Sequence, residues 1–241
     1  MRIEAWSSTM ELRAEPASLG DAYRAARPFP HAVLDGLFPD DDLERVLADF
    51  PRPDQDGWRR FENPAERKLG FHHSTPLPAA LRDFLILLGS PPMLEFLEAL
   101  TGIDGLIPDP YLGGAGPHQI ERGGFLKVHV DFNWHPKLRL DRRLNLLVYL
   151  NKGWREEYGG HLELWNRDLT RAEQRVLPVF NRTVVFDTSD VSFHGHPAPL
   201  ACPPGETRKS VSVYYYTNGR PAEERSAPHD TIFRETPEPR R

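Results

Sequence analysis

The chain has 241 residues and a single cysteine, Cys202, so it cannot form an internal disulfide. A lone cysteine suits a reducing compartment, and we expect a cytoplasmic protein. Long apolar runs are also missing, because the most apolar stretch, residues 81–97, is broken by charges and prolines. The first residues lack the apolar core of a signal peptide. We therefore expect no membrane partner.

An excess of positive charge is absent as well. Lys and Arg number 30 against 35 Asp and Glu, for a net charge of −5. This balance argues against a nucleic-acid partner. The short basic cluster at 139–143 is interpreted as a solvated start of a strand or a patch on the substrate side. No internal repeat is visible, and the length suits one domain, expected over 1–220, with a Pro-rich, charged C-terminal tail over 221–241.

The first part of this domain, residues 1–107, predicts helices with few strands. A strand is expected at 28–35, and a helix begins after Pro39 with three aspartates that complement the helix dipole. Two further helices are expected at 81–88 and 92–100. Residues 51–76 contain four prolines and no clear periodicity. We interpret them as a long loop that could cover a pocket.

The second part, residues 108–220, changes to short strands separated by turn signals. This pattern predicts a mainly β fold, a double-stranded β-helix (jelly roll) supported by the N-terminal helices. The glycine-rich segment 112–116 resembles a phosphate loop, but it leads toward strands and is interpreted as a turn. The expected strands are 125–131, 145–150, 161–165, 183–187, 191–194 and 209–217.

His129 and Asp131 lie two residues apart in the first of these strands. Side chains with this spacing point to the same face of a strand, so both can reach one metal ion. With a distant histidine they would form the facial triad of non-haem Fe(II) oxygenases, which leaves coordination positions open.

The third ligand is expected to be His194, with His196 as its rival. Ser192 and His194 would face the barrel from a strand at 191–194. Gly195 and Pro197 flank His196, and proline lacks the N–H that a strand ladder needs. The strand is therefore predicted to end before His196, and a rigid strand suits a metal ligand better than a strand exit.

Arg208 and Ser210 share one face of the last expected strand. The planar guanidinium binds a carboxylate through two parallel hydrogen bonds, and a neighbouring hydroxyl adds a donor. Inside a barrel an unpaired arginine would be costly. We therefore interpret the pair as a clamp for a carboxylate ligand.

The chain resembles the Fe(II)- and 2-oxoglutarate-dependent oxygenases of the prolyl 4-hydroxylase type, over nearly its whole length. Order and spacing agree for five segments: PFPHAVLD (28–35), GGFLKVHVD (123–131), RLNLLVYLN (143–151), YGGHLEL (158–164), and SFH (192–194) followed by RKS (208–210). Two departures are the second histidine at 196 and the longer spacing to Arg208, with 202–207 as the extra loop.

The resemblance implies Fe(II), 2-oxoglutarate and O2, with ascorbate as a candidate reductant. His129, Asp131 and His194 would bind the iron, and Arg208 would pair with the distal carboxylate of 2-oxoglutarate. Tyr149 matches a position whose hydroxyl touches that carboxylate in relatives. Since Asn145, Leu147 and Tyr149 alternate onto one face, Tyr149 could point into the barrel or could be a core aromatic.

Other polar residues are weaker candidates. His118 is expected at the cosubstrate end of the pocket. The segment 133–135 is a candidate for substrate contact, with loop packing as the alternative. His161 and Glu163 also have metal-ligand spacing, but they fall on an expected structural strand. The pair at 72–73 lies in the expected loop and is assigned to substrate or solvent.

The reaction implied is oxidation, chiefly hydroxylation, of a C–H bond, with 2-oxoglutarate converted to succinate and CO2. A free small molecule, such as an amino acid or a natural-product intermediate, is the expected substrate, and peptidyl hydroxylation is the alternative. Two other classes were weighed: a non-catalytic jelly-roll binding module, and a cupin-like metalloenzyme that uses both histidines without 2-oxoglutarate. The intact metal and carboxylate ligands argue against the first, and the Arg208 clamp against the second.

Overall fold

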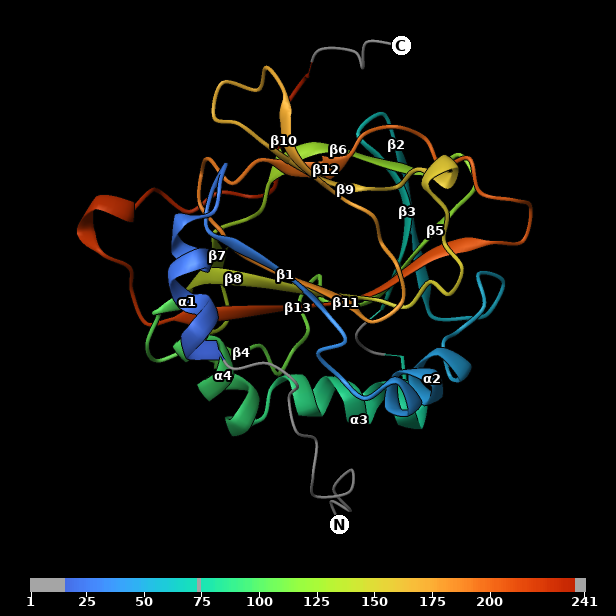
Figure 1. Ribbon diagram of the computed structural model, residues 1–241, viewed down its shortest axis with the longest axis horizontal. Coiled ribbons are helices and arrows are strands. Elements are labelled where there is room, and N and C mark those ends of the chain that lie inside the picture. The colour runs from blue at the N-terminus through green and yellow to red at the C-terminus, as the bar shows by residue number, and fades with distance from the viewer. Residues whose placement is uncertain (1–15, 73–74, 237–241) are drawn as a thin grey trace.

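A computed structural model describes residues 16–72 and 75–236 and confirms the predicted jelly roll. Its main antiparallel path runs β1-β11-β8-β13-β5-β3-β6-β12-β9-β10, which curls into a nearly closed barrel (Figure 1). The strands on this path are β1 (His31–Asp35), β3 (Glu66–Phe71), β5 (Gly116–Glu121), β6 (Phe125–Val130), β8 (Leu140–Tyr149), β9 (Leu162–Trp165), β10 (Ala172–Val176), β11 (Arg182–Asp187), β12 (His194–His196) and β13 (Thr207–Thr217).

Four shorter or peripheral strands pair with this path. They are β2 (Trp58–Asn63) on β3, β4 (Ile107–Pro108) on β13, β7 (Trp134–His135) on β8 and β14 (Ile232–Phe233) on β6. Two 3₁₀ turns, η1 (Glu156–Tyr158) and η2 (Ala222–Glu224), lie in loops. The β12 strand is short and displaced from the expected 191–194, because residues 189–191 form a bend and a turn and residues 192–193 belong to no strand.

The period-2 pattern of β8 explains why the sheet has two distinct faces. Leu144, Leu146 and Val148 are buried in the large core that joins the sheet to the helices. Tyr149 belongs to a second cluster on the barrel side, with strand residues of β9 and β11 and with Leu147 against it. Burying a leucine stabilises a fold by about 1.5–3 kcal/mol, so this alternation orients β8. As a consequence, the polar Asn145 is carried into the barrel.

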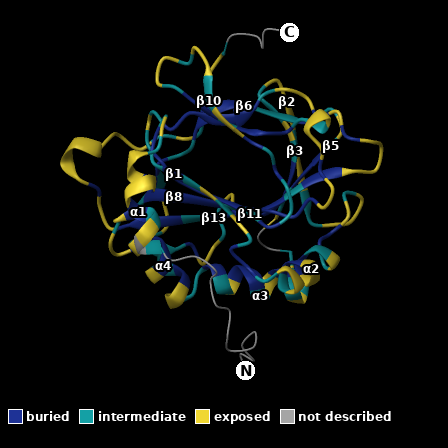
Figure 2. Cartoon of the chain, in the orientation of Figure 1, coloured by how far each residue is buried: buried dark blue, intermediate teal, exposed yellow. Residues whose placement is uncertain are grey.

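The helices cover one face of the sheet. They are α1 (Pro16–Ala25), α2 (Asp40–Ala48), α3 (Ala79–Leu88) and α4 (Pro91–Thr101), and they lie beside or below the strands in Figure 1. Their inner faces are buried and their outer faces exposed (Figure 2). Gly102 ends α4 in the left-handed conformation, at φ 75°.

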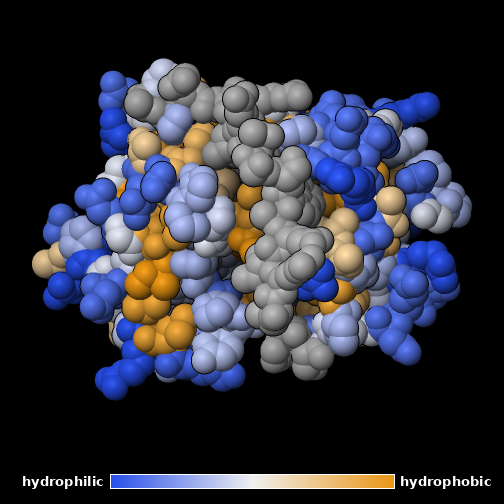
Figure 3. Space-filling view, turned by 90° about the horizontal axis from the view of Figure 1, so that it is seen from below, coloured by the Kyte–Doolittle hydropathy of each residue, from blue (hydrophilic) through white to orange (hydrophobic). Residues whose placement is uncertain are grey.

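The underside of the molecule mixes apolar and polar side chains (Figure 3). Ile86 of α3 is exposed, and an apolar groove beside it runs toward Pro108 of β4. Over the residues with assigned coordinates, no individual helix has the length and apolarity to cross a membrane; α3 and α4 pass that test only together, with a 48° bend between them.

The expectation that residues 51–76 form one long loop is the clearest error in the fold predicted from the sequence. Residues 58–71 form the β2–β3 hairpin, and β3 bridges β5 and β6 in the main sheet. The alternating pattern was hidden because β2 exposes most of its side chains and carries three charged residues against two apolar ones. The hairpin therefore forms one wall of the barrel.

The C-terminal segment 221–236 packs against the barrel. Ile232 and Phe233 pair with Val130 and His129 of β6, and the Arg234 amide donates to the Val128 carbonyl. Docking on β6 orders this part of the segment that we interpreted as a tail. It also brings Phe233 to the entrance of the site described next.

Candidate metal centre and cosubstrate pocket

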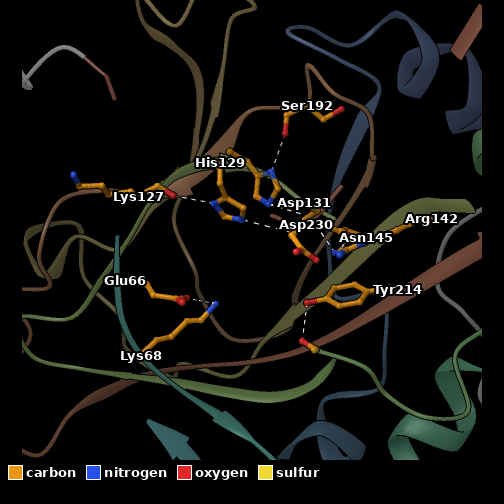
Figure 4. A network of polar contacts seen from close by, with 12 residues as sticks. Glu66, Lys68, Lys127, His129, Asp131, Arg142, Asn145, Ser192, Tyr214 and Asp230 are labelled. Carbon is orange, nitrogen blue, oxygen red and sulfur yellow. Dashed lines mark hydrogen bonds and ion pairs between the residues drawn. The ribbon is translucent and has the colours of Figure 1, made fainter. Parts of the chain in front are cut away.

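Two neighbouring strands bring His129, Asp131 and His194 together. His129 of β6 and His194 of β12 are direct partners in the antiparallel register. Asp131 follows β6, and its two carboxylate oxygens lie 3.6 Å from His129 Nε2 and 3.5 Å from His194 Nε2. The three ligand atoms all lie within 4.8 Å of one another, which makes this a candidate metal site (Figure 4).

Backbone carbonyls orient both imidazole rings. His129 Nδ1 lies 2.9 Å from the Lys127 carbonyl, and His194 Nδ1 lies 2.9 Å from the Ser192 carbonyl. A carbonyl only accepts, so each Nδ1 carries the proton and each Nε2 keeps its lone pair for a metal. Burial lowers the pKa of His194 to about 4, which keeps this ring neutral.

The third ligand, Asp131, is held ionised by its neighbours. Asn145 Nδ2 donates to Oδ2 at 2.7 Å, and Arg142 Nη2 lies 3.0 Å from the same oxygen. Burial opposes ionisation, but Arg142 and the two histidines outweigh it and hold the pKa of Asp131 well below its usual value. The group thus presents two imidazole Nε2 atoms and one carboxylate, the donor set that suits Fe(II) with open positions.

His196 does not join this group. β12 includes both histidines, so the expectation that the strand ends before His196 is wrong, although His194 is the histidine brought to Asp131. The register slips between the two residues. Gly195 allows the slip: a Cβ there would lie 2.9 Å from the Leu126 and Lys127 carbonyl oxygens of β6.

A second buried cation lies deeper in the barrel. Arg208 of β13 donates from Nε to the Gly160 carbonyl at 2.7 Å and from Nη2 to the Tyr149 hydroxyl at 3.1 Å. Ser210 is buried two residues along, opposite Tyr149 on β8 and His118 on β5. Among the residues with assigned coordinates, no carboxylate lies within 4.0 Å of Arg208. The arrangement suits a carboxylate ligand held by arginine and hydroxyl donors.

His118 also faces this interior. Burial, with help from Lys68 and Arg208, lowers its pKa to about 3. It accordingly offers a neutral ring beside the clamp.

A cavity of about 440 Å³ opens on the metal group. His129 and Asp131 form its floor, and His118 lines one side. Its walls come from the β2–β3 hairpin, the turn at 112–115 and the C-terminal residues Thr231 and Phe233. The cavity therefore joins the candidate metal site to three segments that are distant in sequence.

Residues 115–216 match the model of the 2OG-Fe(II) oxygenase superfamily, and this segment contains the metal group and the Arg208 clamp. The matched segment, residues 115–216, belongs to the 2OG-Fe(II) oxygenase superfamily. Fe(II) and 2-oxoglutarate are the cofactor and cosubstrate of that family, and the protein is an iron-dependent dioxygenase.

Solved structures show the same fold at low sequence identity. A prolyl-4-hydroxylase from Pseudomonas putida is 18% identical with a TM-score of 0.59, over 85% of this chain and 100% of that one. A prolyl 4-hydroxylase from Phytophthora capsici is 20% identical with a TM-score of 0.54, over 88% and 69%. The collagen prolyl hydroxylase of Paramecium Bursaria Chlorella virus-1 is 14% identical with a TM-score of 0.51, over 78% and 96%. No curated protein sequence matches the chain.

Different residues of this oxygenase would bind the iron, bind the carboxylate of the cosubstrate and orient the metal ligands. His129, Asp131 and His194 would hold the iron, which supplies the chemistry that couples oxygen to decarboxylation of 2-oxoglutarate and oxidation of substrate. Arg208 and the Tyr149 hydroxyl would anchor a carboxylate. Asn145 and Arg142 keep Asp131 ionised and oriented.

Three residues beside the candidate site were missed from the sequence. The basic cluster 139–143 was interpreted as a solvated start of a strand or a patch on the substrate side, yet Arg142 is fully buried and stacks over the Phe132 and Tyr214 rings. Its position near the start of the largely apolar strand β8 was the available signal. Lys68 and Glu66 were hidden in the expected loop.

The weaker candidates have structural roles. Asn133 bonds Ser226 and the backbone of the C-terminal segment, and His135 pairs with Asp109 at 3.3 Å. Residues 133–135 do not line the cavity. His161 contacts Glu156 at 2.8 Å, while Glu163 pairs with Arg175. The segment 112–116 is a turn, as expected. Of the pair at 72–73, His72 lines the cavity and His73 lies outside the described residues.

Proposed function

We propose that this oxygenase hydroxylates a C–H bond of a free small molecule that carries charged groups, such as an amino acid or a natural-product intermediate. In the same cycle 2-oxoglutarate is converted to succinate and CO2. The observation that carries the proposal is the cavity above His129 and Asp131. Its volume of about 440 Å³ falls in the range of small-ligand pockets.

The walls of the cavity combine aromatic rings with one ion pair. Phe61, Phe71, Phe132, Tyr214 and Phe233 contribute rings around the metal group. Lys68 Nζ lies 3.0 Å from a Glu66 carboxylate oxygen, and both side chains are mostly buried in the β3 wall. In Figure 4 this pair lies across the cavity from His129.

An ion pair in a recognition pocket offers one partner for each sign of charge. A zwitterionic substrate can exchange its own ammonium and carboxylate into this pair, so that every desolvated charge stays compensated. An uncharged substrate gains nothing from it. This favours a substrate with both signs of charge.

Peptidyl hydroxylation is the second candidate, because the similar folds named above include prolyl hydroxylases that act on protein chains by their printed names. A polypeptide needs a groove that is open at both ends. The C-terminal residues 231–233 and the β2–β3 hairpin instead wall this cavity on two sides. That enclosure supports the free small molecule.

The test is substrate-dependent succinate formation with Fe(II), measured against a panel of free amino acids, amino-containing natural products and proline-containing peptides. We expect turnover with free zwitterions. Substitution Glu66→Gln or Lys68→Met should raise KM for the accepted substrate about tenfold or more. The matched control is Glu62→Gln, since Glu62 lies on the same hairpin in an exposed pair with Arg67.

Turnover with peptides and none with free molecules would overturn the small-molecule assignment. Equal KM values in Glu66→Gln and Glu62→Gln would overturn the role of the ion pair. The variant Phe233→Ala tests the wall itself, because opening the cavity should weaken substrate binding while metal binding stays unchanged.

A further inference from the structure

His196 is a buried polar side chain without a hydrogen-bond partner among the described residues. It is 4% exposed, and neither of its ring nitrogens has a hydrogen-bond partner within the described chain. By contrast, His129, His194 and His135 each have at least one ring nitrogen with a partner. A buried polar group without a partner is destabilising by about 1–3 kcal/mol. Such a group calls for a functional explanation.

The position of His196 along β12 places it one step deeper than the metal ligand. Residues two apart on a strand face the same side and are separated by about 6–7 Å. His194 lies opposite His129, whereas His196 lies opposite Leu126, toward the start of β6. That end of the barrel contains Arg208, which contacts the Gly160 carbonyl. His196 thus faces the interior between the metal group and Arg208.

The electrostatic surroundings of His196 favour an anion. Burial lowers the pKa of His196, and the positive charges of Arg208 and Lys68 act in the same direction. Among the described residues, Arg208 donates to the Gly160 carbonyl and the Tyr149 hydroxyl, and its guanidinium carbon lies 4.9 Å from the centre of the Tyr149 ring. An imidazole carries at least one N–H in either protonation state. A carboxylate placed here would accept from His196, Arg208 and Tyr149 together.

We propose that His196 donates a hydrogen bond to the distal carboxylate of 2-oxoglutarate, beside Arg208. The cosubstrate has a carboxylate at each end, and the metal group takes the 2-oxo end. The second carboxylate then reaches the level of His196, two residues beyond His194 on the same strand. Gly195, between the two histidines, allows the close approach to β6, because a Cβ there would lie 2.9 Å from the Leu126 and Lys127 carbonyl oxygens. The proposal rests on the use of 2-oxoglutarate and is independent of the substrate.

The experiment is a calorimetric titration of Ni(II)-loaded protein with 2-oxoglutarate, without substrate. We expect His196→Leu to weaken 2-oxoglutarate binding roughly tenfold or more, since hydrogen bonds to charged groups are the stronger ones. Ni(II) affinity should stay unchanged. His196→Gln, whose amide can still donate, should recover part of the loss.

A ligand that lacks the distal carboxylate tests whether His196 contacts that group. 2-Oxobutyrate keeps the 2-oxo acid and lacks the distal carboxylate. We expect it to bind His196→Leu and the wild-type protein equally. An equal loss for both ligands would overturn the assignment to the distal carboxylate.

The melting temperatures of variants distinguish a role of His196 in 2-oxoglutarate binding from a purely structural role. Replacing an unpartnered buried ring with leucine should leave the melting temperature of the metal-free protein equal or higher. The matched control is His135→Leu, because His135 has partners on both nitrogens. It should lower the melting temperature and leave 2-oxoglutarate affinity unchanged. Unfolding of His196→Leu, or an unchanged 2-oxoglutarate titration, would overturn the proposal.

Discussion

Two buried arginines, Arg142 and Arg208, face the same barrel with opposite degrees of compensation. Arg142 is 1% exposed, lies 3.0 Å from Asp131, donates to Asn145 and stacks over two aromatic rings. Arg208 is 4% exposed and binds one carbonyl and one hydroxyl. The protein itself neutralises Arg142 with a carboxylate, whereas Arg208 remains available to a carboxylate ligand.

This difference follows from the cost of burying charge. A buried ion is tolerated when an opposite charge and hydrogen bonds compensate its lost hydration. Arg142 obtains this compensation permanently, and in return it holds Asp131 ionised for the metal. Arg208 obtains it only when a carboxylate binds. One arginine therefore serves the metal site through a neighbour, and the other serves the cosubstrate directly.

The largest expected effect comes from Asp131→Ala. This variant removes a metal ligand and leaves Arg142 as an uncompensated buried charge. We expect loss of Fe(II)-dependent succinate formation and a fall in the free energy of unfolding of about 3–5 kcal/mol. Metal titration and denaturant unfolding measure the two effects.

The double variant Asp131→Ala/Arg142→Met sharpens this test. It should recover most of the lost stability, because no charge remains unpaired, and recover none of the metal binding. Near-normal turnover in Asp131→Ala would contradict the iron assignment.

The second effect concerns Arg208→Met. Removing the clamp should weaken 2-oxoglutarate binding by about 2–5 kcal/mol, or about 30-fold and more. Arg208→Lys should restore only part, since an ammonium cannot make the two parallel contacts. The free energy of unfolding should not fall, unlike in Arg142→Met, where Asp131 loses its partner. A larger stability loss in Arg208→Met than in Arg142→Met would break the comparison.

The smallest effect concerns the pH dependence of stability that Asp187 causes. Among the described residues, no arginine lies as close to this carboxyl as Arg142 lies to Asp131. Burial raises the pKa of Asp187 to about 6, although the Tyr23 hydroxyl at 2.6 Å and the charge of Arg143 act in the other direction. Because the folded pKa is raised, ionisation costs stability, and this cost grows between about pH 4 and pH 6.

Asp187→Asn stays neutral throughout. The stability of this variant relative to wild type should therefore rise from pH 4 to pH 6, by at most about 3 kcal/mol, and stay level above. Thermal unfolding across this pH range measures the difference. A difference that does not change with pH would show that Asp187 has an ordinary pKa.

The sequence was most informative where one strand carries a whole pattern. His129 and Asp131 lie on one face of β6 because side chains alternate, and the apolar residues of β8 and β13 alternate in the same way. It failed for β2, whose exposed, charged residues hide the alternation, and for β3, which begins with three charged residues in a row. Arg142 was misjudged because its burial depends on Asp131 and Tyr214, which other segments of the chain bring to it.

The register slip between the two histidines of β12 could not be predicted from the sequence, for another reason. The order Ser192, His194, His196 suggests a single face with the ladder ending early. The register slip at Gly195 depends on the β6 carbonyls opposite, and these are set by pairing between segments about 65 residues apart.

The sequence by itself determined the chemistry that is available: an iron-ligand pair on one strand, a third histidine, a carboxylate clamp and a jelly-roll pattern. Local periodicity suffices for these, because each depends on neighbours within a few residues. Only the tertiary structure decided which arginine is compensated, which histidine faces Asp131 and which stays without a partner. Those outcomes depend on burial and on contacts between distant strands, and a buried charge or ring acquires its role only from what the fold places beside it.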